Sequence, residues 1–397
     1  MQDEWARPRV CRRRWDDDPV RSARVAPLMV AVLVLLTACT GFGAGIRQSS
    51  SWWGQTVCGR ADADAPPDVP SPSEAPAGLS VGVQFHGMWD DYTDADRIEV
   101  LDRLAAAGVD SVRLDVSWAM LQPDGPDRYD EWGVAFVDRV IGMATARGLS
   151  PLVMFWLTPP WANGDAGVRA PPDDPADFGR VAQWAAERWA GEVAAWEVWN
   201  EPNHDDFLRG ADPAEYVGLL KAAYCGFKTG APETPVVFAG TQYVDLDWVD
   251  RAYEAGAAGW FDVMGAHPYM GVADAPPETP DDGTGRTLDA VGDLHEFLTD
   301  HGDGDKPIWI TEIGWSTHED TTDTPGWARG VSPSVQADYL VRALDKVRDE
   351  HPYVTRFYWY AERDKSTGDE HYDNFGLLTT ELRGKPAYQA LANYLRG

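Results

Sequence analysis

The sequence of 397 residues predicts an α/β fold, a (β/α)8 TIM barrel formed by a single domain over residues 79–397. Apolar segments of strand length alternate with helical segments eight times along this region. The strand segments are nearly continuous runs of Val, Ile, Phe and Trp, as expected of strands buried on both faces. A doubly wound open sheet is disfavoured because no Gly-rich turn follows the first strand.

Each predicted helix alternates with a strand, and glycines mark where the first two helices end. The first helix places Ile98, Leu101 and Leu104 on one face and ends at Gly108, where a helix C-cap favours a left-handed residue. Gly148 ends the second helix in the same way. The predicted strands are 81–87, 111–118, 151–157, 193–199, 236–241, 261–266, 307–313 and 355–360. The predicted helices are 95–107, 132–147, 176–190, 213–228, 248–257, 288–300, 334–350 and 386–395.

The N-terminal segment has the pattern of an export signal. Seven Arg lie within residues 1–24, and the apolar run Val25–Leu36 follows. This run is too short to span a bilayer and is typical of a secretory signal peptide. The segment from Leu36 to Cys39 resembles the bacterial lipoprotein box, which implies that residues 1–38 are removed and that Cys39 is lipidated as the mature N-terminus. The alternative is an ordinary signal peptide, which would leave the protein secreted rather than anchored on the outer face of the cytoplasmic membrane.

Residues 39–78 are predicted to be a spacer, which continues into a linker rich in Pro, Ala and Asp. Removal of the signal peptide leaves Cys58 and Cys225 in the barrel-bearing chain. An exported protein tolerates disulfides, so these two cysteines can form a bridge, and the alternative is two free thiols.

Charge and histidine spacing limit the partners. The chain has 34 Lys and Arg against 64 Asp and Glu, a formal net charge of −30. This charge argues against a nucleic-acid partner, and it leaves a lipid anchor as the means of membrane attachment. The eight His lack the paired spacing of zinc sites, so we expect no metal ion and no cofactor. The oligomeric state cannot be read from the sequence.

Two glutamates follow apolar strands at the end of the barrel where function is expected. Glu201 follows the fourth strand and Glu312 ends the seventh. In an acidic protein the simplest interpretation of each is a solvated loop residue. However, two carboxyl groups that face each other across a sugar are what glycoside hydrolysis requires, one protonated and one ionised.

The motifs around these glutamates resemble a known group of enzymes. Asn200-Glu201-Pro202 and Thr311-Glu312 resemble the retaining glycoside hydrolases of clan A. The resemblance implies that Glu201 is the general acid/base, that Glu312 is the nucleophile and that Asn200 binds the substrate 2-hydroxyl. Within the clan the chain resembles family 39 most, through the stretches 197–203, 216–224, 357–360 and 385–388. Family 5, which includes cellulases, shares the two catalytic motifs and is the alternative.

Further residues at the strand ends are candidates for substrate binding. His86 follows the first strand, and His267 and Tyr269 resemble clan positions that bind sugar and hold the nucleophile. The alternative for His267 and Tyr269 is core packing. Arg113 would keep Glu312 ionised by its charge, and its alternative partners are Asp115 and Glu197.

Aromatic residues near the strand ends are candidates for stacking on sugar rings. Trp315 and Trp359 follow or end strands seven and eight, where a flat ring can meet the apolar face of a sugar. Trp161 and Trp327 lie in loops and are candidates for outer subsites. Glu197 is predicted to point into the barrel and to be structural.

The predicted function is that of a retaining endo-acting β-glycosidase, which hydrolyses a cell-envelope or extracellular polysaccharide by double displacement. Xylosidases and iduronidases of family 39 carry additional β-domains, whereas this chain stops at the eighth helix, which favours endo action. The alternatives are an exo-acting β-xylosidase-like enzyme and a transglycosylase, which uses the same residues. A catalytically silent polysaccharide-binding protein on the cell surface is the alternative from another class.

Overall fold

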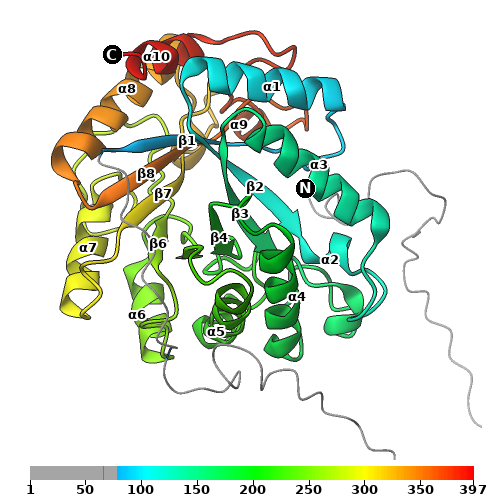
Figure 1. Ribbon diagram of the computed structural model, residues 1–397. Helices are drawn as coiled ribbons and strands as arrows, with labels where there is room; N and C mark the ends of the chain where they lie inside the picture. Colours follow the sequence, from blue (N-terminus) through cyan, green and yellow to red (C-terminus); the bar gives the residue numbers. More distant parts are fainter. Residues whose placement is uncertain (1–65, 67–77) are drawn as a thin grey trace, which may run out of the picture.

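The computed structural model describes Pro66 and residues 78–397. The described chain forms a closed barrel of parallel strands in sequential order, with β8 paired to β1, and helices surround it (Figure 1). The predicted (β/α)8 barrel is therefore confirmed. The strands are β1 Ser80–Gln84, β2 Ser111–Ser117, β3 Ser150–Trp156, β4 Ala195–Val198, β5 Val236–Phe238, β6 Val263–Ala266, β7 Ile308–Ile313 and β8 Val354–Trp359.

Each strand is followed by a helix, and most helices begin at a polar cap residue. The long helices are α1 Asp94–Ala107, α3 Glu131–Thr145, α4 Pro175–Arg188, α5 Pro213–Gly230, α6 Leu246–Glu254, α7 Ala290–Asp300, α8 Pro333–Glu350 and α10 Pro386–Tyr394. The sequence analysis missed the short helices α2 Trp118–Leu121 and α9 Glu370–Asp373, and the 3-10 turns η2 Pro160–Ala162 and η3 Gly326–Ala328. These four segments all lie in loops that follow strands.

Local capping explains where α1 begins and ends. The Thr93 side chain accepts a hydrogen bond from the amide of Asp96, and the Asp96 carboxylate accepts one from the amide of Thr93, which forms a capping box. At the other end Gly108 has φ +94°, the left-handed conformation predicted for it.

Two apolar layers hold the barrel together. The larger one lies between the strands and the helices. A smaller cluster is formed by residues of six strands, Leu152, Ala195, Val237, Val263, Trp309 and Tyr358. A polar network that includes Arg113 and Glu197, both almost completely buried, links β2 to β4. This network lies close to the carboxyl ends of the strands and positions the site described below.

Several sequence predictions concern residues that lie outside the described part of the chain. Cys225 is buried in α5 and is disulfide-bonded, whereas its predicted partner Cys58 lies outside the described residues. The predicted signal peptide 1–38, the lipidation site Cys39 and nearly all of the spacer 39–78 also lie outside them. Within the described part of the chain, no helix combines the length and the apolar character needed to cross a bilayer.

Candidate active site

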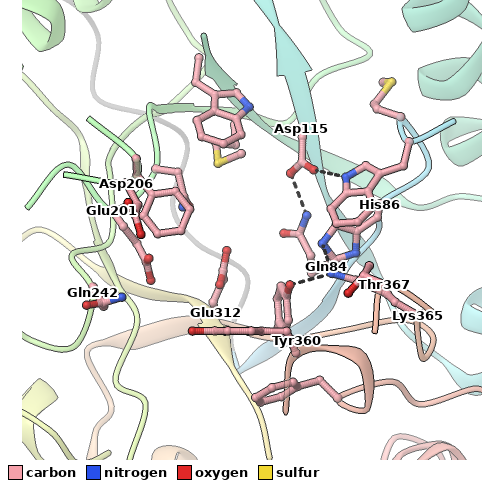
Figure 2. Close-up of a pocket in the computed structure, with 18 of the residues that line it drawn as sticks. Gln84, His86, Asp115, Glu201, Asp206, Gln242, Glu312, Tyr360, Lys365 and Thr367 are labelled. Carbon is pink, nitrogen blue, oxygen red and sulfur yellow. Dashed lines mark hydrogen bonds between the residues drawn. The ribbon is translucent and has the colours of Figure 1, made fainter. Parts of the chain in front are cut away.

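A large cavity opens at the carboxyl ends of the strands. Its volume is about 1100 Å³, and Glu201 and Glu312 both line it. Figure 2 shows Glu201, Asp206 and Gln242 on one side of the cavity, Glu312 and Tyr360 near its centre, and His86, Asp115 and Lys365 on the opposite side.

The backbone at the end of β4 turns Asn200 and Glu201 toward the cavity. Trp199 and Glu201 both have positive φ angles, +74° and +38°. Residues other than glycine rarely adopt this left-handed region, and each instance costs about 1–3 kcal/mol unless its surroundings hold it. Trp199 is buried and donates its indole N–H to the carbonyl of Phe207, which helps to hold the turn. Strained backbone of this kind concentrates at functional sites.

Glu201 belongs to a chain of hydrogen bonds that fixes where protons can lie. Thr311 donates its hydroxyl hydrogen to Glu197, so its oxygen is left to accept from His267 Nε2, which is 3.0 Å away. A neutral His267 therefore carries its hydrogen on Nε2 and offers Nδ1 as an acceptor. Nδ1 lies 2.9 Å from Glu201 Oε1. This arrangement requires one proton between Glu201 and His267, and the proton can reside on the carboxyl group.

Electrostatics favour the protonated form of Glu201. Burial raises the pKa of Glu201, and the nearby Glu312 adds to this, against the opposing effects of His267 and Arg113. Burial would lower the pKa of His267, but Glu312 and Glu201 outweigh it, so the pKa of this imidazole lies above its ordinary value.

Glu312 has the opposite environment. Arg113 Nη1 donates to its Oε1, and the Tyr269 hydroxyl donates to its Oε2 at 3.1 Å. Burial alone would raise the pKa of Glu312, but the charges of His267 and Arg113 and these two hydrogen bonds outweigh it and hold the pKa below its ordinary value. Glu312 is thus kept ionised, as a nucleophile requires.

The distance between the two glutamates matches one of the two geometries of glycoside hydrolysis. One carboxylate oxygen of Glu201, one of Glu312 and a ring nitrogen of His267 all lie within 4.8 Å of one another. Retaining enzymes place the two carboxyl groups about 5–5.5 Å apart, whereas inverting enzymes leave about 6.5–9.5 Å for a water molecule. The close approach of the two glutamates agrees with the shorter of these separations.

The other predicted site residues divide into two groups. Asn200, His86 and Tyr269 line the cavity. Asn200 accepts a hydrogen bond from Arg113 through Oδ1 at 2.9 Å, which leaves its amide N–H groups as donors for a ligand. Arg113 and His267 lie behind the cavity wall instead, so the prediction that they bind substrate is corrected. They contact the two glutamates rather than the cavity.

Arg113 resolves the alternatives that the sequence left open for its partner. Its guanidinium contacts both Glu312 and Glu197, and it also donates to Gln84 at 2.8 Å. Asp115, the other candidate, is hydrogen-bonded to Gln84 and Trp89 instead. Glu197 is completely buried inside the barrel, as predicted.

The prediction that Trp359 stacks on sugar is wrong, whereas stacking by Trp315 stays a prediction. Trp359 is 0% exposed and does not line the cavity, whereas Trp315 lines the cavity and is 1% exposed. The two rings pack on each other at 6.0 Å. Side chains alternate along a strand, so the ring that follows Trp359 points the other way, and Tyr360 is the aromatic residue that lines the cavity there. Sequence reasoning missed this because a one-residue shift changes the face.

Of the two candidates for outer aromatic subsites, the structure places one in the cavity lining. Trp327 lines the cavity and is 52% exposed. Trp161 does not line it, because its ring packs edge-on against Trp118 and its N–H donates to the carbonyl of Gln122. Trp132 at the start of α3 and Tyr372 in α9 are exposed and line the cavity, but were not predicted.

Three polar residues of the cavity were also not predicted as site residues: Gln84, Asp115 and Lys365. Lys365 Nζ donates to the Tyr360 hydroxyl at 2.8 Å and lies 4.2 Å from the centre of the Trp89 ring. The position of Asp115 on a strand was the available signal, since side chains two residues apart share a face and Arg113 was already a candidate. Lys365 lies in a loop, where no periodicity applies.

Two groups of described residues have the atom types of a metal site. The first is Glu201, His267 and Glu312, whose atoms already bond to one another and to Arg113. The second is Asp289, Glu350 and His351. There the Lys346 ammonium lies 2.7 Å from Asp289 and 2.6 Å from Glu350, so a cationic side chain already occupies this group.

Comparison with known proteins is consistent with this site. The family model described as cellulase (glycosyl hydrolase family 5) matches residues 74–214, and the one described as glycosyl hydrolase catalytic core matches residues 198–384. Beta-glucosidase 40 of Arabidopsis thaliana is 28% identical over 120 residues, 30% of this chain and 22% of the relative. Beta-glucosidase A of Thermotoga maritima is 29% identical over 114 residues, 26% of this chain and 23% of the relative. The chain thus matches less than a quarter of the length of these curated relatives.

Solved structures share the fold over most of the chain. A family 39 glycoside hydrolase of Bacteroides cellulosilyticus WH2 has a TM-score of 0.65 and 23% identity, and the match covers 83% of this chain and 65% of that chain. A GH5_18 protein of Streptomyces cattleya, in complex with Manb1-4GlcNAc, has a TM-score of 0.62 and 19% identity, with 80% of each chain covered.

The closed barrel and the paired carboxylates match the fold and the chemistry of glycoside hydrolases, and two glycosyl hydrolase family models each match part of the chain. More particularly, the family 5 model matches part of the chain, and the solved structures share its fold.

Proposed function

We propose that this chain is a retaining β-glycosidase in which Glu201 is the general acid/base and Glu312 the nucleophile. The observation that carries the proposal is the close approach of two carboxylates whose pKa values are shifted in opposite directions. A raised pKa suits the proton donor, and a lowered pKa suits the group that must attack. The β-glucosidase relatives support β-specific cleavage.

The proposed reaction follows from the positions of the groups. Glu201 donates its proton to the glycosidic oxygen while Glu312 attacks the anomeric carbon, so that the leaving sugar departs and a glycosyl-enzyme ester forms. Glu201, now ionised, then takes a proton from water, and the water oxygen displaces Glu312 from the anomeric carbon. In both steps Asn200 can donate to the neighbouring 2-hydroxyl group.

We further propose endo action on a cell-envelope or extracellular polysaccharide. The cavity exceeds the usual 300–1000 Å³ of a small-ligand site, which gives room for several sugar units. Exposed aromatic side chains line it at α3, through Trp132, and at the loops after β7 and β8, through Trp327 and Tyr372. Sugars on both sides of the glutamate pair are what an interior cleavage site requires.

The test is the anomeric form of the product together with a nucleophile variant. Proton NMR of early products should show the β-anomer first, which indicates retention. Glu312→Gln should lower kcat by at least about 1000-fold, because covalent catalysis is removed while the binding groups remain. Short oligosaccharides released from β-glucans, xylans or bacterial exopolysaccharides would support endo action, and monosaccharide alone would contradict it. An α-anomeric first product, or a fully active Glu312→Gln, would overturn the proposal.

The N-terminal segment supports a proposal on location. We propose that the protein is exported and anchored through a lipid on Cys39, on the evidence of the sequence alone. Mass spectrometry of the N-terminal peptide from membranes tests this. A diacylglycerol-modified Cys39 is the expected result, and an unmodified peptide that begins after residue 39 would contradict it. Membership of family 39 rather than family 5 is likewise a proposal, supported by the Bacteroides neighbour, whereas the family 5 model match favours the alternative.

A further inference from the structure

One side of the cavity is enclosed by polar and aromatic side chains that the proposed mechanism does not use. The enclosure begins at Glu312 and is formed by two walls. In the first wall Arg113 donates to both Glu312 and Gln84, and Gln84 donates its amide hydrogen to Asp115 at 2.9 Å. Three consecutive hydrogen bonds thus connect the nucleophile to Asp115, which is 6% exposed.

The second wall leads from Glu312 to Lys365. Tyr269 donates to Glu312, its ring meets that of Tyr360 edge to face at 6.4 Å, and Lys365 donates to the Tyr360 hydroxyl at 2.8 Å. Figure 2 shows Tyr360 and Lys365 in this arrangement, with Lys365 and Asp115 both on the side of the cavity away from Glu201.

Trp89 joins the two walls at their far ends. Its indole N–H donates to Asp115 at 3.1 Å, and the Lys365 ammonium lies 4.2 Å from its ring centre. Seven of the eight residues that form the two walls and join them line the cavity, and the eighth, Arg113, lies behind the cavity wall. The space between the walls is therefore a compartment next to the nucleophile, on the side opposite the proton donor, where the sugar that reacts at its anomeric carbon must lie.

Asp115 and Lys365 have hydrogen-bonding capacity left for a ligand. Each carboxylate oxygen of Asp115 accepts one bond, from Gln84 or Trp89, although it has room for two. Lys365 directs one hydrogen to Tyr360 and a second toward His86 Nε2 at 3.4 Å, which leaves a third of its three donors. Within the described part of the chain Lys365 forms no salt bridge. An unused acceptor and an unused donor at one end of the compartment match neighbouring hydroxyl groups, since each hydroxyl donates and accepts.

The charges of the compartment decide between a neutral and an acidic sugar. The carboxylates of Glu312 and Asp115 and the ammonium group of Lys365 line it, and the Arg113 guanidinium behind the wall pairs with Glu312. Burial lowers the pKa of Lys365 and raises that of Asp115, so both groups gain from ligand hydrogen bonds. A carboxylate on the bound sugar would meet two like charges.

We propose that Asp115 and Lys365 are specificity-determining residues that bind two neighbouring free hydroxyl groups of a neutral sugar held next to Glu312, and that they exclude a uronic acid from this position. The inference rests on the proposed function, in which Glu312 attacks the anomeric carbon of the bound sugar. It adds the substrate class: the sugar on the non-leaving side is neutral and has two neighbouring free hydroxyl groups, so in an interior unit the preceding sugar is attached at another position.

The test compares 4-nitrophenyl β-D-hexosides with the uronides of the same ring stereochemistry, for the gluco, manno and galacto series, on the full chain. The best neutral hexoside should exceed its uronide by at least about 100-fold in kcat/KM, the loss expected when a buried group meets an unpaired like charge. Asp115→Asn and Lys365→Met should each lower kcat/KM for the hexoside by about 10- to 100-fold, because each removes a charge-assisted hydrogen bond. Asp115→Asn should also lower the ratio of kcat/KM for the hexoside to kcat/KM for the uronide, whereas Lys365→Met should not lower this ratio.

A matched control is Lys306→Met. Lys306 is a half-buried lysine just before β7, outside the cavity, and pairs with Asp303 at 3.0 Å. This variant should keep the kcat/KM of the wild type, and thermal melting of all variants identifies any that fail to fold. Unchanged hexoside kinetics in folded Asp115→Asn and Lys365→Met, or a uronide that is preferred, would overturn the inference while leaving the proposed function intact.

A binding measurement separates this inference from the proposed function. Calorimetry with methyl β-glycosides on Glu312→Gln reports recognition without turnover. If the wild-type protein hydrolyses no substrate, and binding to Glu312→Gln is lost on adding Asp115→Asn, the result would support the compartment and contradict the proposed enzymatic activity. Absence of both binding and hydrolysis with every neutral probe would overturn the inference.

Discussion

Replacement of Thr311 by Val removes one oxygen from the hydrogen-bond chain that holds the proton of Glu201. Thr311 lies at the end of β7, is completely buried and accepts from His267 Nε2 while it donates to Glu197. Val has nearly the same shape and suits a strand, so we expect the fold to persist. Without the hydroxyl oxygen, the Nε2–H group faces a methyl group, and His267 gains by moving its hydrogen to Nδ1, where it donates to Glu201. A donor at this position stabilises the ionised form of Glu201 and lowers its pKa.

Thr311→Val removes two hydrogen bonds, and the change in the pKa of Glu201 follows from the one that His267 donates. A neutral hydrogen bond contributes about 0.5–1.5 kcal/mol, and one pKa unit corresponds to about 1.4 kcal/mol, so the pKa of Glu201 should fall by about 0.4–1 unit. Glu201 donates a proton only when protonated. The high-pH limb of kcat/KM, where this proton is lost, should therefore shift to lower pH by the same amount.

The assay is the pH profile of kcat/KM for an alkyl β-glycoside, whose poor leaving group needs the proton, beside a dinitrophenyl glycoside, whose leaving group does not. The shift should appear with the first substrate and be much smaller with the second. Thr311→Ser keeps the hydroxyl and is the matched control, with a profile close to that of the wild type. Equal profiles for the Val and Ser variants, or a shift to higher pH, would refute the proton arrangement inferred for Glu201 and His267.

Two other variants test the environment of the nucleophile and the core. Tyr269→Phe removes a hydrogen bond to Glu312 and should raise the pKa of that carboxyl, so the low-pH limb of kcat/KM, where Glu312 becomes protonated, should shift to higher pH by about 0.5–1 unit; an unmoved limb in the pH profile would contradict the assigned contact. Trp359→Ala should cost about 3–5 kcal/mol of unfolding free energy in denaturant titrations, because the ring is completely buried, while the KM of the folded variant stays near that of the wild type. A stable variant with a strongly raised KM would instead indicate that the Trp359 ring stacks on the substrate sugar.

The sequence was sufficient for the barrel because its signals are repeated. Strands such as Val236–Phe238 and Val263–Ala266 are apolar, as expected of strands buried on both faces, and glycines such as Gly108 mark helix ends. The two glutamates could be found because each follows such a run in a recognisable motif. The short helices α2 and α9 could not, since four residues are too few to establish a helical period.

The remainder of the site depends on facts that a single sequence does not contain. Trp359 and Tyr360 are adjacent aromatic residues, and which of them faces the cavity depends on where β8 ends. His267 was expected to hold the nucleophile, yet its Nδ1 lies 2.9 Å from Glu201 and 4.0 Å from Glu312. That difference of about one ångström determines which glutamate forms a hydrogen bond with His267. The difference arises from the way β4, β6 and β7 pack together.

The opposite pKa shifts of the two glutamates depend on the position of Arg113. Its planar group makes hydrogen bonds to Glu312, Glu197 and Asn200, but none to Glu201 among the described contacts. Both glutamates are buried, and burial alone would protonate both. His267 and the guanidinium lower the pKa of Glu312, and the charge of Glu312 then adds to the raised pKa of Glu201. A Lys at this position could supply the charge, but not three directed donors in one plane, so the placement of one arginine assigns opposite protonation states to two otherwise similar side chains.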